Sequence, residues 1–139
     1  MEPSEIIEFQ NEIVVSITSL IPSEWSMLVL NFETLESESG STITNRICFW
    51  VNENGNEFNN DNLSITLEVE DKLLTLRHEL KENGKAWDVC DLTIFPSGQY
   101  DINFSYDGPK RLLGEFDFDS MFKYDSHLEE YKRRIEALS

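Results

Sequence analysis

The spacing of apolar residues changes along the chain, and this change constrains the fold more than any other feature. From about Ser4 to Leu20 apolar residues recur at steps of three and four, at Ile6, Phe9, Ile13, Ile17 and Leu20. These steps predict one buried face of a helix. From Trp25 onward the step becomes two, which is typical of a half-buried strand. The chain must therefore combine helices with a sheet.

The alternating segments predict antiparallel hairpins. Leu28, Leu30 and Phe32 share one face of a first strand, and the polar turn "LESESGS" leads to a second strand from Ile43 to Val51. The pair Asn54-Gly55 suits a tight turn, after which we expect a short third strand that ends at Phe58.

A further hairpin is predicted from Trp87 to Asp107, around a Pro-Ser-Gly turn. Strict alternation places Asp91 on the apolar face of this hairpin, so we expect a bulge or a frayed strand there. The expected core-facing residues are Trp87, Val89, Phe95, Tyr100, Ile102, Phe104 and Tyr106.

Two more helices complete the prediction. One begins at Asn62 or Ser64 and runs to about Glu82, and another follows the apolar stripe from Met121 to Leu138. We therefore predict an α+β fold, an antiparallel sheet of four to five strands with helices packed on it, in the order α-β-β-(β)-α-β-β-α. The length of 139 residues fits a single domain, 1–139.

Charge restricts the partners. The chain has 27 acidic residues against 11 Lys and Arg, a net charge of −16. Most of this lies before Lys72, where fourteen acidic residues face one base, Arg46. Nucleic acids and anionic membranes would repel such a chain, whereas a basic protein would be attracted to it. The acidic N-terminus lacks the basic start of a secretory signal, so we expect a cytoplasmic protein with reduced cysteines.

The sequence offers little chemistry. Cys48 and Cys90 lie in predicted strands, where a free cysteine acts as a small apolar residue. His78 and Glu79 resemble the start of a zinc motif, but Glu82 stands at i+4 in place of the second histidine. We expect neither catalytic residues nor a metal or other cofactor, and hence no enzyme. A small hydrolase that uses paired carboxylates is the weakest alternative.

Three segments together resemble a known family. They are "IPSEW" (Ile21 to Trp25) between helix and strand, "ELKENGKAW" (Glu79 to Trp87) at a helix end, and "QYDINFSYD" (Gln99 to Asp107) after a Gly-containing turn. Their order and spacing are similar to those of the YezG-like bacterial immunity proteins (antitoxins). The C-terminal part departs from that family, because "FKYDSHLEEYKRR" (Phe122 to Arg134) lacks a Trp.

The resemblance implies a protein that binds and neutralises a cognate polymorphic toxin, in several cases a nuclease. It supplies no catalytic residues. The alternative is an acidic adaptor or chaperone-like module for another basic protein. The charge pattern predicts a partner-binding surface at two loops, with Trp50 either an aromatic anchor or a core residue. The predicted partner-binding residues are Glu33, Glu36, Glu38, Trp50, Glu53, Glu57 and Asp61.

Overall fold

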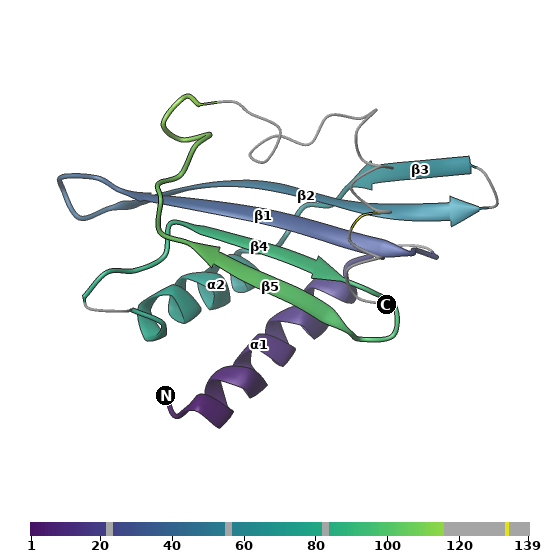
Figure 1. Cartoon of the computed structure of the whole chain (residues 1–139), viewed down its shortest axis with the longest axis horizontal. Coiled ribbons are helices and arrows are strands. Elements are labelled where there is room, and N and C mark those ends of the chain that lie inside the picture. Colours follow the sequence, from purple (N-terminus) through teal and green to yellow (C-terminus); the bar gives the residue numbers. More distant parts are fainter. Residues whose placement is uncertain (22–23, 55–56, 82–83, 116–132, 134–139) are drawn as a thin grey trace.

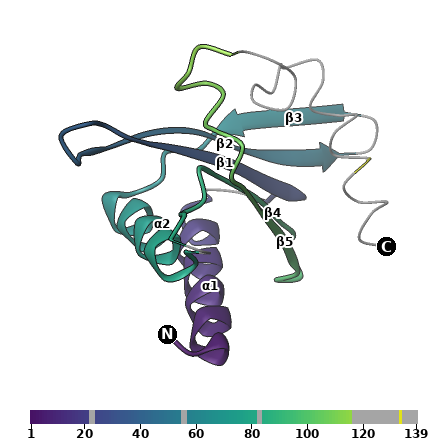
Figure 2. The same cartoon turned by 60° about the vertical axis from the view of Figure 1, so that its left-hand side comes forward.

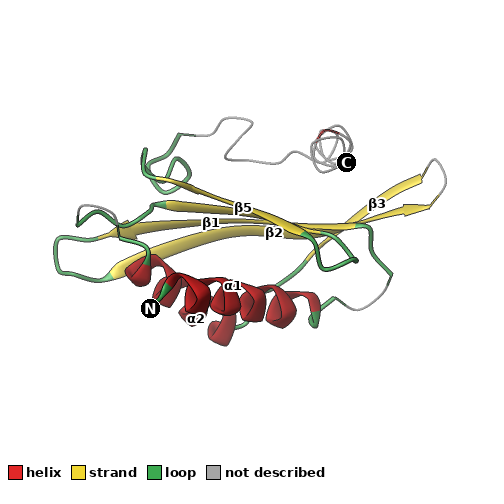
Figure 3. Cartoon of the chain, turned by 60° about the horizontal axis from the view of Figure 1, so that its bottom comes forward, coloured by secondary structure: helices red, strands yellow, loops and turns green. Residues whose placement is uncertain are grey.

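A sheet with two helices on one of its faces forms the described part of the chain, which in this computed structural model comprises residues 1–21, 24–54, 57–81, 84–115 and 133. Figure 2 and Figure 3 show both helices on the same side of the sheet. The α+β class with an antiparallel sheet is thus confirmed. The helix predicted from Met121 to Leu138 lies outside the described residues and stays a prediction. The elements are α1 (Pro3–Thr18), β1 (Met27–Glu36), β2 (Thr42–Asn54), β3 (Glu57–Asn62), α2 (Leu67–Glu79), β4 (Val89–Ile94) and β5 (Tyr100–Ser105).

The strands lie in the order β3-β2-β1-β4-β5, and every neighbouring pair is antiparallel. β1 is the central strand, with Leu28 opposite Trp50 of β2 on one edge and opposite Ile94 of β4 on the other. The turn between β1 and β2 projects beyond the rest of the sheet (Figure 1). The last residues of β2 and the first residues of β3 lie at the opposite end.

The main core fills the space between the sheet and the helices. α1 buries Ile13 and Ile17, and α2 buries Leu73 and Leu76. They face Leu28, Leu30 and Phe32 of β1 in one cluster, as the alternation predicts. Trp87 lies edge-on to Phe32, with ring centroids 6.3 Å apart, and is tilted against Phe104 at 5.5 Å. Aromatic pairs at such distances add to the stabilisation from buried area.

The other face of the sheet is apolar over part of its length and polar over the rest. Met27, Val29, Phe49 and Val51 form a second buried cluster there. Further along β1 the same face carries Asn31 and Glu33, which are 5% and 1% exposed. The alternation in β1 therefore separates an apolar side from a side that changes from apolar to polar.

The helix boundaries differ slightly from the prediction. α1 begins at Pro3, because proline suits the first helical turn, and its N-cap Glu2 makes no side-chain cap bond. α2 begins at Leu67, where Thr66 accepts a hydrogen bond from the Val69 amide at 3.2 Å, and it ends at Glu79. Neither Asn62 nor Ser64 caps it, since Asn62 still belongs to β3.

The short strand predicted to end at Phe58 is instead β3, which covers Glu57–Asn62. Asparagine is depleted in strands, so this Asn-rich stretch indicated a loop. Pairing with the extended end of β2 overrides that preference, and the register places Asn59 opposite Asn52.

The bulge or fraying expected at Asp91 is wrong. β4 pairs with β5 in regular register, with Asp91 opposite Asn103 on the face away from the helices. Cys90, Leu92 and Ile94 face the helix-side core instead, so Val89 and Phe95 were also assigned to the wrong face. The alternation shifts because the chain bends at Asp88, between Trp87 and the start of β4. On β5 the predicted faces are confirmed, with Tyr100, Ile102 and Phe104 packed on the core and Asp101 and Asn103 exposed.

Two leucines of α2 provide a matched test of this packing. Leu73 is fully buried and Leu67 is 78% exposed. We expect Leu73→Ala to lower the free energy of unfolding by about 2–5 kcal/mol, because it leaves a cavity in the core. Leu67→Ala should change it by less than about 0.5 kcal/mol. Urea unfolding followed by circular dichroism measures both, and equal losses would contradict the described packing of α2.

Candidate partner-binding surface

The three acidic residues predicted around the first hairpin turn have different surroundings. Glu33 is buried on the face away from the helices. Glu36 ends β1, and its carboxylate accepts a hydrogen bond from the Arg77 guanidinium at 2.8 Å. This bond and the positive charge of Arg77 lower the pKa of Glu36. Glu38 lies exposed in the turn. Glu36 and Glu38 are therefore the two that reach the surface.

The second predicted group lies at the other end of the sheet. Glu53 belongs to β2, and Glu57 and Asp61 belong to β3, so the expected loop is in fact a pair of strands. The reason is again that pairing with β2 overrides the loop-forming composition. Trp50, opposite Asp61, is 9% exposed and packs in the helix-side core, which is the second of its two predicted roles.

The two groups do not form one patch. β2 has 13 residues, and at roughly 3.3 Å per residue its ends are about 40 Å apart. A standard interface covers about 800 Å² of each partner, which corresponds to a patch about 30 Å across. A partner of ordinary size can therefore contact one end of the sheet or the other.

Glu33 belongs to a buried polar cluster centred on Arg111, which the sequence did not reveal. Arg111 Nη1 lies 3.3 Å from a Glu33 carboxylate oxygen and donates to Asn31 Oδ1 at 2.6 Å. Its Nε donates to Asn45 Oδ1 at 2.7 Å, and the second Glu33 oxygen accepts from the Leu112 amide at 3.2 Å. Burial lowers the pKa of Arg111, and the charge of Glu33 opposes that shift.

This cluster fastens the segment after β5 to the sheet. Asn31, Glu33 and Asn45 lie side by side because Glu33 pairs with Asn45 in the β1–β2 register. The only sequence signal was that polar residues follow apolar ones on a single face of β1. The cluster explains why Glu33 is buried: its carboxylate is bonded to Arg111 and to the Leu112 amide instead of lying at the surface.

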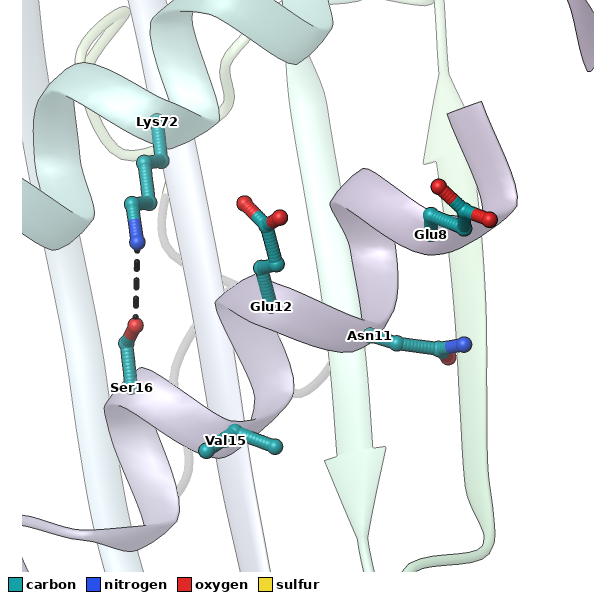
Figure 4. A pocket seen from close by; sticks show the side chains of 6 residues that line it. All are labelled: Glu8, Asn11, Glu12, Val15, Ser16 and Lys72. Atoms are coloured by element: carbon teal, nitrogen blue, oxygen red, sulfur yellow. Dashed lines mark hydrogen bonds between the residues drawn. The ribbon is translucent and has the colours of Figure 1, made fainter. Parts of the chain in front are cut away.

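A second acidic surface lies on α1. Glu5, Glu8 and Glu12 are exposed and form no salt bridge within the described residues. α1 contains no Lys or Arg, and the basic residue closest in the helix layer, Lys72 of α2, donates to Ser16 Oγ at 3.2 Å and pairs with Glu68 at 3.5 Å. Figure 4 shows Lys72 directed at Ser16, with the carboxylates of Glu8 and Glu12 beside a shallow hollow.

In the helical spacing that puts Ile6, Ile13 and Ile17 on one face, these glutamates fall on the opposite, solvent-facing side. Lys72 lines the same hollow as Glu8 and Glu12, but its ammonium is bonded to Ser16 and Glu68, and this arrangement depends on how α1 packs against α2, which the sequence did not show. Exposed carboxylates outside ion pairs keep most of their field toward solvent, so α1 is the most one-sided charged element in the described chain.

The two cysteines occupy places where a thiol is unreactive. Cys48 is 5% exposed and Cys90 is fully buried. Burial raises the pKa of Cys48 to about 12 and raises that of Cys90 as well. Among the residues that the structure describes, no three His, Cys, Asp or Glu side chains are grouped to hold a metal ion. In the same residues no helix has the length and apolar character needed to cross a membrane.

No protein-family model matches this sequence, and no curated protein is similar to it.

Disrupting the Arg111 cluster should lower the stability of the fold by a large amount. Arg111→Leu leaves Glu33 buried without its charge partner, so the free energy of unfolding should fall by about 3–5 kcal/mol. Arg46→Leu is the control, because Arg46 is 40% exposed in its pair with Glu70. Its replacement should lower the free energy of unfolding by less than about 1 kcal/mol. Adding Glu33→Gln to Arg111→Leu should recover part of the loss. Equal effects of the two arginine variants in chemical unfolding would refute the cluster's role.

The burial of both cysteines predicts that thiol reagents do not label the native protein readily. In mildly alkaline buffer, a thiol reagent such as Ellman's should react with neither Cys48 nor Cys90, since both are buried and protonated. In denaturant both thiols should react at once. Absorbance measures the reaction. Rapid modification of the native protein would show that solvent reaches at least one thiol and would contradict its burial.

Proposed function

We propose that this protein is an immunity protein that binds a cognate secreted polymorphic toxin in the cytoplasm and neutralises it by stoichiometric inhibition. The toxin domain is a basic protein, and a nuclease fits best. The resemblance to the YezG-like immunity proteins supports this proposal. The charge distribution supports it independently of that resemblance.

One observation carries the proposal. In the first 71 residues the single base is Arg46, and it already pairs with Glu70 at 3.6 Å. Glu5, Glu8, Glu12 and Glu38 are exposed and form no salt bridge with any residue that the structure describes. An acidic surface of this kind suits a partner that is itself strongly basic.

The physical logic is that of a competitor for an anionic substrate. A nuclease needs a positive surface to hold phosphates. An acidic protein that covers this surface repels the nucleic acid, and complementary charge speeds its capture of the toxin. Rapid capture protects a cell that makes the toxin, so the charge serves the association rate more than the final affinity.

The proposed interface residues lie in different parts of the fold. Glu36 and Glu38 lie at one end of the sheet, and Glu53, Glu57 and Asp61 are in strands at the other end. We therefore propose that the toxin contacts one of these ends together with neighbouring acidic surface, while Glu33 and Trp50 support the fold. An adaptor for another basic protein would use the same surface and differ only in its partner.

Charge reversal tests the proposal against the toxin domain encoded by a neighbouring gene. We expect co-expression of the wild-type chain to restore growth of cells that produce this domain. Replacing Glu36, Glu38 and Glu57 with Lys should slow association at least about tenfold, because steering is lost. The control reverses Asp101, Asp107 and Glu115, which are exposed in the less acidic half of the chain. Surface plasmon resonance at two ionic strengths measures both rates.

Failure of the wild-type chain to bind the domain or rescue growth would overturn the immunity function. An equal loss in both triple variants would show that net charge matters and that the proposed ends of the sheet do not. Binding to a harmless basic protein, with no rescue, would favour the adaptor.

A further inference from the structure

A second hollow lies on the other side of α1, between this helix and the turn that joins β4 to β5. Its volume is about 380 Å³. Trp25, Phe95 and Tyr100 contribute to its wall and are only partly buried. Its lining residues are Asn11, Val14, Val15, Thr18, Trp25, Phe95, Pro96, Gly98 and Tyr100. We call it the α1–turn groove.

The groove has fixed walls. The Tyr100 hydroxyl donates to Asn11 Oδ1 at 2.8 Å, which ties β5 to α1. The turn is closed by bonds from the Phe95 amide to the Gln99 carbonyl and from the Gly98 amide to the Phe95 carbonyl, both 2.9 Å. Gly98 has a φ of 88°, which glycine adopts without strain. A partner would therefore meet a preformed surface and lose little free energy in ordering it.

Apolar side chains of α1 extend this surface. Val15 is 66% exposed and Ile7 is 57% exposed. They lie eight residues apart with Asn11 midway between them, so all three share one stripe of the helix. Single exposed apolar residues need no explanation, but these two continue a hollow that is lined in part by aromatic residues. Such a combination is typical of the centre of a binding surface.

Charge indicates what would occupy the groove. Glu8 and Glu12 lie next to this stripe, and Val15 and Asn11 line both hollows, pointing away from Lys72 in Figure 4. The groove's own lining carries no charged residue, and the adjoining hollow, which shares Asn11 and Val15 with it, carries the two carboxylates. A second copy of this chain would bring the same carboxylates and a net charge of −16, so it would be repelled. A basic partner instead gains ion pairs in the adjoining hollow.

We propose that the α1–turn groove binds an apolar side chain of the partner that is flanked by Lys or Arg residues. The apolar side chain packs on Val15 and Trp25, and the flanking cations pair with Glu8 and Glu12 in the adjoining hollow. This inference rests on the proposed function, since the partner is the basic toxin domain. It places the centre of the interface on α1, at a distance from the charged hairpin turn.

Surface variants of α1 test the inference with the same toxin domain as the probe. The double variant Ile7→Gln and Val15→Gln should weaken binding at least about tenfold, mainly by faster dissociation, because packed central contacts govern the dissociation rate. The double variant Glu8→Gln and Glu12→Gln should mainly slow association. The controls are Ile43→Gln, 48% exposed on β2, and Asp71→Asn, exposed on α2. Circular dichroism confirms that each variant is folded.

The outcomes separate the two proposals. If the wild-type chain does not bind the toxin domain, the proposed function fails and this inference with it. If the wild-type chain binds and both α1 variants bind within about twofold of it, the inference alone fails. A mass of two chains in light scattering, reduced to one by Val15→Gln, would show a second copy in the groove and also overturn it.

Discussion

β1 is hydrogen-bonded on both edges and buried on both faces, and the remaining elements are arranged around it. Its residues from Met27 to Thr34 are all buried. Since side chains alternate in a strand, a shift of one residue would turn Asn31 and Glu33 toward the helices and expel Leu30 and Phe32 from the main core. The register with β2 and β4 therefore follows from the two different faces of a single strand.

Those two faces explain what the sequence could and could not predict. Leu28, Leu30 and Phe32 reveal the helix-side core, because the spacing is local and apolar. The other face depends on Arg111, which is 78 residues beyond Glu33 in the chain and reaches it only in the folded structure. Local spacing therefore identified β1 correctly yet indicated that Glu33 was an exposed binding residue. The same limit applies at Asp91, where a bend at Asp88 reverses the faces of the next strand.

For the candidate surface, too, the sequence shows some properties and the fold decides others. Counting charges identified the acidic half of the chain, and this needed no structure. Whether those charges act together is set by topology, because the long β2 strand separates Glu36 from Glu57 by about 40 Å. Conversely, Glu8 and Glu12 were ordinary members of a wet helix face. The packing of α1 gives them a candidate binding role, because it places a groove with aromatic residues next to their hollow. It also leaves Lys72 bonded to Ser16 and Glu68.

The excess of carboxylates over basic groups also has a consequence for the free protein. With a net charge of −16 the folded chain repels itself, and this repulsion lowers its stability at low ionic strength. Dissolved salt screens that repulsion and should stabilise the free fold, whereas it should weaken a complex with a basic partner. A partner that supplies positive charge acts like a local and specific form of that screening. Under the proposed function, the same carboxylates that destabilise the free protein would therefore favour the complex, since binding removes the repulsion that folding alone leaves in place.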